Sequence, residues 1–292
     1  MKEIVVISGK GGTGKTSLTA SFAVLGGKSL VTADCDVDAA DMHILLQPEV
    51  KKAEDFYSGV LASIDPSLCT GCGACDEVCR FDALEEKDGV YSVIPLNCEG
   101  CGYCARICPP EAIRMEDQNV GEWYESRIKT GTLMVHARLG IGAENSGKLV
   151  AKVKNEAKRI AREQECKIVL VDGSPGIGCP VVSSLSGADF AVFVTEPTVS
   201  GLHDLKRVHE LVRRFSIPSG CIINKSDLNP ETTEQVKAFL AEAGIRHLAD
   251  LPYDESFTRA MVQGKTIVEL DSGELKNQIS ACWNRILDTA NA

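Results

Sequence analysis

The sequence has no long apolar run. No stretch of its 292 residues approaches the roughly 18 to 20 consecutive apolar residues that a membrane-spanning helix needs. The first residues, MKEIVVIS, carry one lysine and a short apolar run. A signal peptide has a longer apolar region and a small-residue cleavage site. We therefore expect a cytoplasmic protein.

Positive charge is also scarce. Lysine and arginine number 31 against 41 acidic residues, which gives a formal net charge of −10, and no basic run stands out. Nonspecific nucleic-acid binding depends on a basic surface, so we expect no nucleic-acid partner. The C-terminal stretch has apolar residues at helical spacing but only Lys276 and Arg285 on its polar side. A membrane-surface helix is rich in both, so we expect this helix to pack on the core rather than to anchor a membrane.

Cysteine, by contrast, is abundant. The chain has 13 cysteines, and eight of them fall between Cys69 and Cys108. Clustered cysteines in a cytoplasmic protein indicate metal ligands rather than disulfides. The others are scattered, and most are expected to be small buried apolar residues: Cys35, Cys166, Cys179, Cys221 and Cys282.

Short apolar runs alternate with helical patterns along most of the chain. This alternation predicts an α/β fold, with a doubly wound, mostly parallel sheet whose strands are buried on both faces. The expected strands are 3–8, 29–34, 167–172, 190–196 and 219–225. The expected helices are 16–25, 148–164, 201–215, 230–244 and 274–292.

A cysteine-rich segment interrupts the alternation. It has short loops and no long apolar strand, which indicates a small α+β domain inserted after the second strand. The expected domains are a first part at 1–63, an insert at 64–116 and a second part at 117–292. Residues 120–147 carry glycines and aromatics and are interpreted as a β-hairpin or a docking segment.

Residues 9–16, GKGGTGKT, match the phosphate-binding pattern G-x-x-x-x-G-K-[S/T] between a strand and a helix. Glycines let backbone N–H groups close around phosphate oxygens, and the helix N-terminus favours negative charge. Lys15 supplies a positive charge to the phosphates and the Thr16 hydroxyl can ligate Mg²⁺. The expected nucleotide-binding residues here are Gly9, Lys10, Gly11, Gly12, Thr13, Gly14, Lys15, Thr16 and Ser17.

Lys10 gives this loop a second lysine and resembles the deviant P-loop of the MinD/ParA/Mrp and nitrogenase iron protein group. The resemblance implies an ATPase that forms a homodimer, with Lys10 reaching the partner subunit's phosphates. Asp34 and Asp36, in ADCD at 33–36, resemble the group's first switch, and Asp172, in VDGSPGIG, its second. By this resemblance Asp34 and Asp172 hold Mg²⁺.

Phosphoryl transfer needs charge neutralisation and an oriented water more than a covalent partner. Lys10, Lys15 and Mg²⁺ are expected to supply the first, and Asp36 to orient the water. The nearby Asp38 and Asp41 extend the acidic run, and each alone is also compatible with a helix-cap or turn role.

Two segments bear on which nucleotide base this site binds. Asn224 begins NKSD, a sequence that fits the guanine-selecting N-K-x-D pattern of GTPases. In the group resembled here the asparagine contacts adenine instead, and the rest of the match favours ATP. The resemblance also implies base contacts from LPYDES, through Pro252 and Asp254.

The eight clustered cysteines form two copies of C-x2-C-x2-C-x3-C, separated by 18 residues. This duplication resembles a bacterial two-cluster ferredoxin, in which three thiolates of one motif and the fourth of the other hold each [4Fe-4S] cluster. The first expected set is Cys69, Cys72, Cys75 and Cys108, and the second is Cys98, Cys101, Cys104 and Cys79. Arg80 stands where the ferredoxin pattern has proline. Four-cysteine zinc sites are the competing interpretation.

Together these features predict an ATP-hydrolysing switch with ATP, Mg²⁺ and two [4Fe-4S] clusters. Its nucleotide state would be coupled to electron transfer, or to metal or Fe–S cluster assembly, on a redox or metallocluster protein partner. The alternative is a MinD/ParA-like positioning or partition ATPase that uses the insert as a docking module. A nitrogenase-iron-protein-like reductase is disfavoured, because Cys179 has no evident second cysteine of the right kind.

Overall fold

The computed structural model describes residues 1–140, 146–270 and 273–291. They divide into two compact units. The first unit is Met1–Glu54, Glu122–Leu139 and Ser146–Ala292, and the second is formed mainly by Asp55–Gly121. The sequence-based insert limits, 64–116, lie inside the second unit, because strands β3 (Glu49–Ile64) and β6 (Ile113–Arg127) extend beyond both limits.

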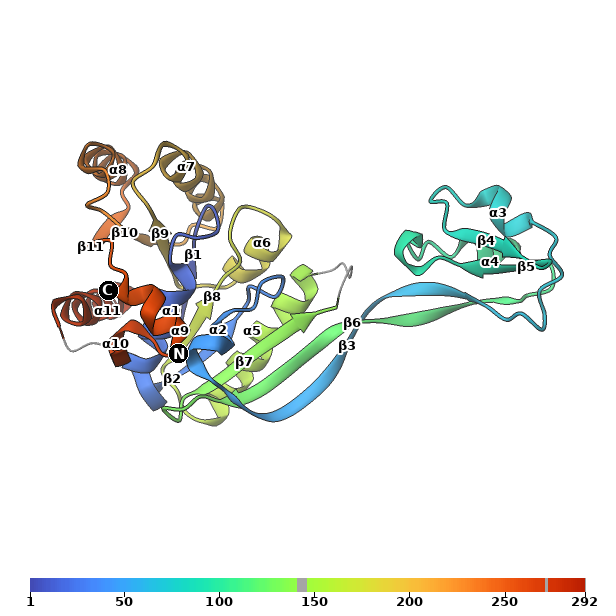
Figure 1. The fold of residues 1–292 in the computed structure, drawn as a ribbon, viewed down its shortest axis with the longest axis horizontal. Helices are drawn as coiled ribbons and strands as arrows, with labels where there is room; N and C mark the ends of the chain where they lie inside the picture. The colour runs from blue at the N-terminus through green and yellow to red at the C-terminus, as the bar shows by residue number, and fades with distance from the viewer. Residues whose placement is uncertain (141–145, 271–272, 292) are drawn as a thin grey trace. The chain divides into compact units, whose positions relative to one another are not determined.

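The first unit is an α/β domain with a large, mostly parallel sheet, as the alternating pattern predicts (Figure 1). The sheet order is β11-β10-β9-β1-β8-β2-β7-β6-β3. Its further strands are β1 (Lys2–Ile7), β2 (Leu30–Asp34), β7 (Leu133–Leu139), β8 (Ile168–Asp172), β9 (Phe190–Thr195), β10 (Ser219–Asn224) and β11 (Arg246–Leu251). The pairings of β1 with β8 and β9, of β2 with β7 and β8, and of β10 with β9 and β11 are all parallel.

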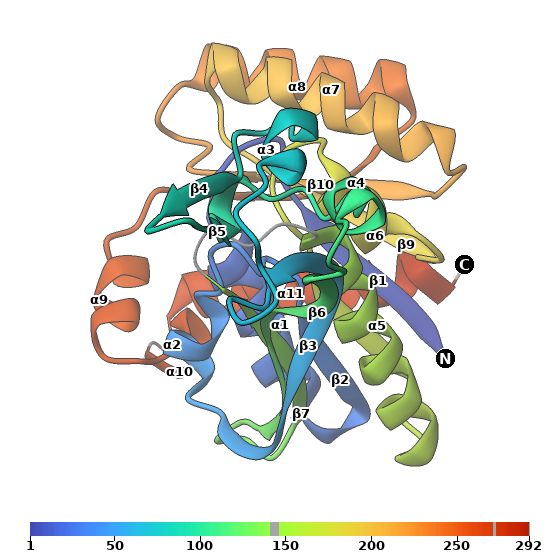
Figure 2. The same cartoon turned by 90° about the vertical axis from the view of Figure 1, so that its right-hand side faces the viewer.

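Helices cover both faces of this sheet because successive strand residues alternate between the faces. Ile4 and Val6 of β1 belong to a core that includes Phe22 of α1 and Trp283 of α11, whose rings stack at 5.3 Å. On the other face α7 and α8 lie side by side (Figure 2), and Phe193 of β9 contacts His209 of α7 edge-on. The helices are α1 (Lys15–Gly26), α2 (Met42–Leu46), α5 (Ser146–Glu163), α6 (Cys179–Leu185), α7 (Val199–Arg214), α8 (Pro230–Ala243), α9 (Ser256–Val262), α10 (Ile267–Leu270) and α11 (Glu274–Asn291), with a 3₁₀ turn at Gly27–Ser29.

The segment 120–147 contains a hairpin. Strands β6 and β7 are neighbours in the sheet, and the turn between them is closed by the Ile128 N–H, which donates to the Thr132 carbonyl at 2.9 Å. The β-hairpin interpretation therefore holds for the described part of this segment, while residues 141–145 lie outside the described residues. No described helix is long and apolar enough to cross a membrane.

The second unit is built from short elements around a small core. Its further elements are α3 (Ala74–Val78), β4 (Leu84–Lys87), β5 (Val90–Val93), α4 (Tyr103–Ile107) and a 3₁₀ turn at Pro95–Asn97. Strands β4 and β5 pair antiparallel, from Leu84 with Val93 to Lys87 with Val90. The buried residues Ala62, Cys75 and Ile113 form the centre of its core.

Candidate functional site

The phosphate-binding loop connects β1 to α1. Its last glycine, Gly14, caps the helix in the left-handed conformation at φ 90°. A Cβ at this position would lie 2.4 Å from Nδ2 of Asn224. A side chain at position 14 would therefore be strained. This explains why the loop ends in glycine at the residue before α1 begins.

Three side chains converge at the start of α1. Lys15 Nζ lies 2.8 Å from Asp172 Oδ2, and the Thr16 hydroxyl donates to the same oxygen at 2.8 Å. Lys15 also lies 3.4 Å from Asp36 Oδ2. Burial alone would lower the pKa of Lys15, but the Asp172 and Asp36 carboxylates outweigh it and raise the pKa. Lys15 therefore remains charged at the end of β8.

The carboxylates of Asp34 and Asp36 also act on the charge of Lys15. Asp34 accepts the Asp36 N–H on Oδ1 at 3.2 Å, while its Oδ2 is buried without a hydrogen-bond partner among the described residues. Burial, and then the charge of Asp172, raises the pKa of Asp34 well above its usual value. Burial also raises the pKa of Asp36, against the opposing effect of Lys15. The cluster has more negative than positive charge, which favours a further cation here.

Lys15, Thr16 and Asp36 border a cavity of about 400 Å³, which we call the P-loop cavity. Its lining brings together most of the predicted phosphate-binding residues and Asp36. It also includes residues that the sequence did not single out, from the loop before α2, from α2, from the second switch and from α9. These are Ala39, Ile44, Leu45, Pro175 and Met261.

Some predicted residues lie outside this lining. The following predicted residues are not among those that border the cavity: Gly9, Lys10, Asp34, Asp172, Asn224, Pro252 and Asp254. Asp254 instead accepts the Ser256 N–H at 2.7 Å, at the start of α9. Pro252 and Asp254 therefore do not share the cavity surface that Lys15 borders.

Asn224 connects the end of β10 to the P-loop. Its Nδ2 donates to the Thr13 carbonyl at 2.8 Å, and its Oδ1 accepts the Lys225 N–H at 3.1 Å. Asp227, the last residue of NKSD, accepts the Tyr253 N–H at 2.6 Å. Both side chains thus have roles within the chain.

Lys10 contacts the segment that follows β9. Its ammonium pairs with Glu196, which also pairs with Lys225 at 3.0 Å. Lys10 further donates to Ser200 Oγ at 3.0 Å. Glu196 directly follows β9, and the sequence did not single it out.

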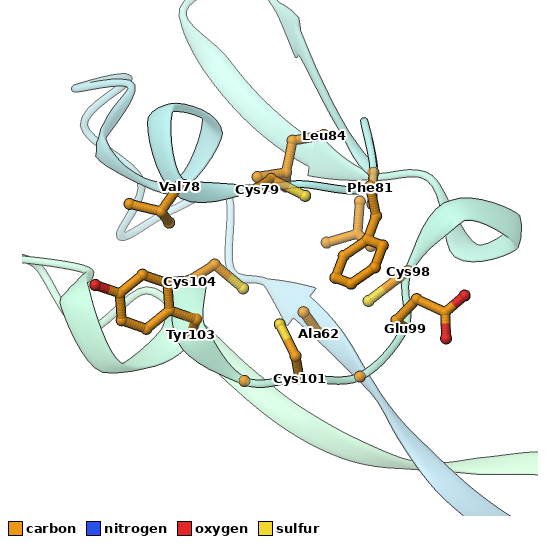
Figure 3. Close-up of a pocket in the computed structure, with 14 residues that line it drawn as sticks. Ala62, Val78, Cys79, Phe81, Leu84, Cys98, Glu99, Cys101, Tyr103 and Cys104 are labelled. Atoms are coloured by element: carbon orange, nitrogen blue, oxygen red, sulfur yellow. The ribbon is translucent and has the colours of Figure 1, made fainter.

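In the second unit the eight clustered cysteines line two separate cavities. The first cysteine cavity is bordered by Cys79, Cys98, Cys101 and Cys104, whose sulfurs face a common space in Figure 3. The second cysteine cavity is bordered by Cys69, Cys72, Cys75 and Cys108. Each cavity thus takes three cysteines from one motif and the last cysteine of the other, which are the two sets expected from the sequence.

Glycines allow the loops to close tightly around these cavities. Gly100 has φ +63°, and a Cβ there would lie 2.1 Å from the Val60 carbonyl oxygen.

Burial raises the pKa of the Cys75 and Cys104 thiols. Within residues 1–140, 146–270 and 273–291, no group of three or more His, Cys, Asp or Glu side chains is arranged to hold one metal ion.

One relative by sequence matches most of the chain, and another matches only a short part of it. The uncharacterized protein MJ0578 of Methanocaldococcus jannaschii is 36% identical over 229 residues, which cover 78% of this chain and 79% of that protein. Ferredoxin-1 of Rhodobacter capsulatus is 53% identical over 30 residues, which cover 10% of this chain and 46% of that protein.

Solved structures share the fold. The septum site-determining protein MinD of Pyrococcus horikoshii, complexed with Mg-ADP, matches with a TM-score of 0.59 at 17% identity, covering 99% of this chain and 97% of that one. The MinC:MinD cell division protein complex of Aquifex aeolicus matches with a TM-score of 0.58 at 17% identity, covering 99% and 96%.

The family assignment rests on a match through most of the chain. The sequence pattern described as "CobQ/CobB/MinD/ParA nucleotide binding domain" matches residues 4–267, which include the P-loop, Asp34, Asp36 and Asp172. The chain therefore belongs to the CobQ/CobB/MinD/ParA nucleotide-binding family.

Proposed function

We propose that the chain is an ATP-hydrolysing molecular switch of the MinD/ParA type. The observation that carries the proposal is the contact of Lys15 and Thr16 with Asp172, 2.8 Å each, beside the P-loop cavity. A charged lysine, a hydroxyl and a buried carboxylate at a helix N-terminus are the parts that phosphate binding and Mg²⁺ binding require.

The residues present fit Mg²⁺ with ATP. Asp34 Oδ2 is a buried carboxylate oxygen without a described partner, and Mg²⁺ needs only one or two such ligands because it keeps several waters. Thr16, Asp34 and Asp172 would hold the ion, which neutralises phosphate charge when it is bound. Lys15 then binds phosphate oxygens, and Asp36, at the edge of the cavity, orients the attacking water.

Adenine is the base that we propose. Guanine selection by N-K-x-D uses the carboxylate of Asp227, and one oxygen of that carboxylate, Oδ1, already accepts the Tyr253 N–H. The relative bound to Mg-ADP in its solved structure shares this fold. Asn224, Pro252 and Asp254 remain the proposed base contacts, and Asn224 would have to exchange one of its present hydrogen bonds for them.

We also propose that the two cysteine cavities hold [4Fe-4S] clusters in a ferredoxin-like unit. The support is the division of eight cysteines into two sets of three plus one, together with the 30-residue similarity to a ferredoxin. The thiols of each set are the ligands, and the surrounding apolar side chains, such as Ala62, Phe81 and Leu84, would limit the access of water.

The output of the switch has two candidates. The similar solved structures include a septum site-determining protein MinD and a MinC:MinD cell division protein complex, which favours a positioning ATPase that forms a homodimer and docks a partner through its second unit. The cysteine cavities are the observation that favours electron transfer, or metal or cluster assembly, on a redox or metallocluster partner.

The proposal is tested with anaerobically purified protein. We expect Mg²⁺-dependent ATP hydrolysis, and ATP-dependent dimerisation measured by light scattering after gel filtration. The proposal would be wrong if neither ATP binding nor hydrolysis were detected in the presence of Mg²⁺.

The two outputs separate in further measurements on the same protein. ATP-dependent co-sedimentation with DNA or liposomes supports positioning. Iron transfer to an apo acceptor on addition of ATP supports assembly, whereas an ATP-shifted reduction potential without iron loss supports electron transfer.

A further inference from the structure

Thr19 is a buried hydroxyl one turn into α1. Its side chain is fully excluded from solvent, and its Oγ1 lies 2.8 Å from Oδ1 of Asp172. The same Oγ1 lies 2.9 Å from the carbonyl oxygen of Lys15. Thr19 is not among the residues that line the P-loop cavity.

A threonine hydroxyl has a single proton, which can be donated to one acceptor at a time. Hydrogen bonds to an ionised acceptor are stronger than those to a neutral carbonyl. Because Asp172 is fully buried, its carboxylate has no water to replace a lost donor. The proton of Thr19 therefore goes to Asp172, and the Lys15 carbonyl is the secondary contact.

The donors to Asp172 are divided between its two oxygens. Lys15 and Thr16 both approach Oδ2, whereas Thr19 alone among the described side chains approaches Oδ1. A carboxylate can otherwise rotate about its last side-chain torsion, which has a broad profile. The Thr19 bond fixes that torsion, so that Oδ2 stays directed at Lys15 and Thr16.

We propose that Thr19 is a positioning residue that orients Asp172 for the divalent cation. The inference rests on the proposed function, since it assigns Asp172 to Mg²⁺. Partners that orient metal-binding carboxylates contribute roughly 10- to 100-fold to metal affinity. Loss of the Thr19 hydroxyl should therefore weaken the response to Mg²⁺ and leave the binding of metal-free nucleotide intact.

The chain offers a matched control on the same helix. Ser21 is also buried, and its hydroxyl donates at 2.8 Å to the carbonyl of Ser17, four residues earlier, with no carboxylate partner. Ser21→Ala removes a buried hydroxyl from α1 without touching Asp172. Thr19→Val removes the hydroxyl at nearly constant volume, and Thr19→Ser retains it.

The test measures the Mg²⁺ concentration for half-maximal ATP hydrolysis, and the affinity for a fluorescent ATP analogue in EDTA. We expect Thr19→Val to raise the Mg²⁺ midpoint about tenfold or more, with affinity in EDTA unchanged. Thr19→Ser and Ser21→Ala should retain the midpoint of the unmodified chain. If Thr19→Val does not fold, Thr19→Ala is compared with Thr19→Ser, because these two variants differ only by the hydroxyl.

The outcomes are distinct. An unchanged Mg²⁺ midpoint in Thr19→Val would overturn the inference, as would an equal rise in Ser21→Ala or Thr19→Ser. If ATP hydrolysis by the unmodified chain did not depend on Mg²⁺, the proposed function would be overturned, whatever the results for the variants.

Discussion

The Lys10 ammonium is paired with the Glu196 carboxylate of its own chain. Lys225 occupies the other oxygen of this carboxylate at 3.0 Å and also donates to the Gly12 carbonyl at 3.2 Å. Lys10 is 30% exposed and borders no part of the P-loop cavity. The ion pair between Lys10 and Glu196 can therefore break without a change in the phosphate-binding loop. A role of Lys10 across a dimer would require this.

The first prediction follows for Lys10→Ala. Nucleotide affinity should stay within a few-fold of the unmodified chain, because the cavity lining is unchanged, while hydrolysis loses its dependence on protein concentration. The measurements are fluorescent-nucleotide titration and hydrolysis rates over a range of protein concentrations. Lys225→Ala, which removes the other lysine from Glu196, should retain the concentration dependence. Hydrolysis that persisted unchanged in Lys10→Ala would contradict the dimer role.

The second prediction concerns the attacking water. Asp36→Asn keeps the shape of the side chain but cannot accept a proton, so ATP binding should persist while kcat falls about 100-fold or more. Asp38→Asn is the matched control, because Asp38 lies two residues away, is exposed and does not border the P-loop cavity. Equal kcat values in the two variants would remove Asp36 from the mechanism.

The phosphate-binding part of the site could be predicted because its residues are consecutive. Glycine spacing, Lys15 and Thr16 stand in one motif, and Asp172 is the last residue of a buried strand. The contacts of Glu196 and Met261 could not be predicted in this way. Each comes from a segment remote in sequence, and a single carboxylate or methionine carries no signal of what it will meet.

The same reasoning applies to the strands. Buried parallel strands such as β8 are short apolar runs, and the sequence predicts them closely. Strand β3 was missed because the first seven of its 16 residues are exposed and mostly polar. Strand β11 was missed because it begins with the exposed Arg246 and His247, so that only its second half has the apolar pattern of a buried strand. Pairing with neighbouring strands, which no local pattern records, decides both cases.

The third prediction is a pH dependence of stability in the first unit. Burial, and then the charge of His43, lowers the pKa of His136 from 6.5 to about 4. Between these values the unfolded chain binds a proton that the folded chain does not bind, so stability falls as pH decreases from about 6.5 towards 4. The full loss from this one group is at most about 3 kcal/mol.

Urea unfolding followed by tryptophan fluorescence measures this effect, because both tryptophans, Trp123 and Trp283, lie in the first unit. His136→Gln stays neutral and can still bond to Ser126 Oγ, the present partner of the ring at 2.9 Å. This variant should flatten the pH dependence between pH 6.5 and 4.5. His203→Gln, which changes an exposed histidine, should not alter the slope. An unaltered slope in His136→Gln would assign the pH dependence to other groups.

The last prediction concerns how the cysteines are shared between the two cavities. If each cavity holds a [4Fe-4S] cluster, the unmodified chain carries about eight iron atoms, and the loss of one cluster leaves about four. Cys69 and Cys108 border the same cavity although they belong to different motifs, whereas Cys69 and Cys79 share a motif but border different cavities. Replacing both Cys69 and Cys108 by serine should therefore leave about four iron atoms, whereas replacing both Cys69 and Cys79 should leave almost none.

Iron and acid-labile sulfide, assayed anaerobically, check these values. Cys166→Ser is the control, because Cys166 borders neither cysteine cavity and its removal should leave the iron content unchanged. The reverse result, with more iron in the Cys69/Cys79 variant than in the Cys69/Cys108 variant, would show that each motif holds its own cluster. Zinc in place of iron and sulfide in the unmodified chain would contradict the cluster assignment itself, since a four-cysteine zinc site contains no inorganic sulfide.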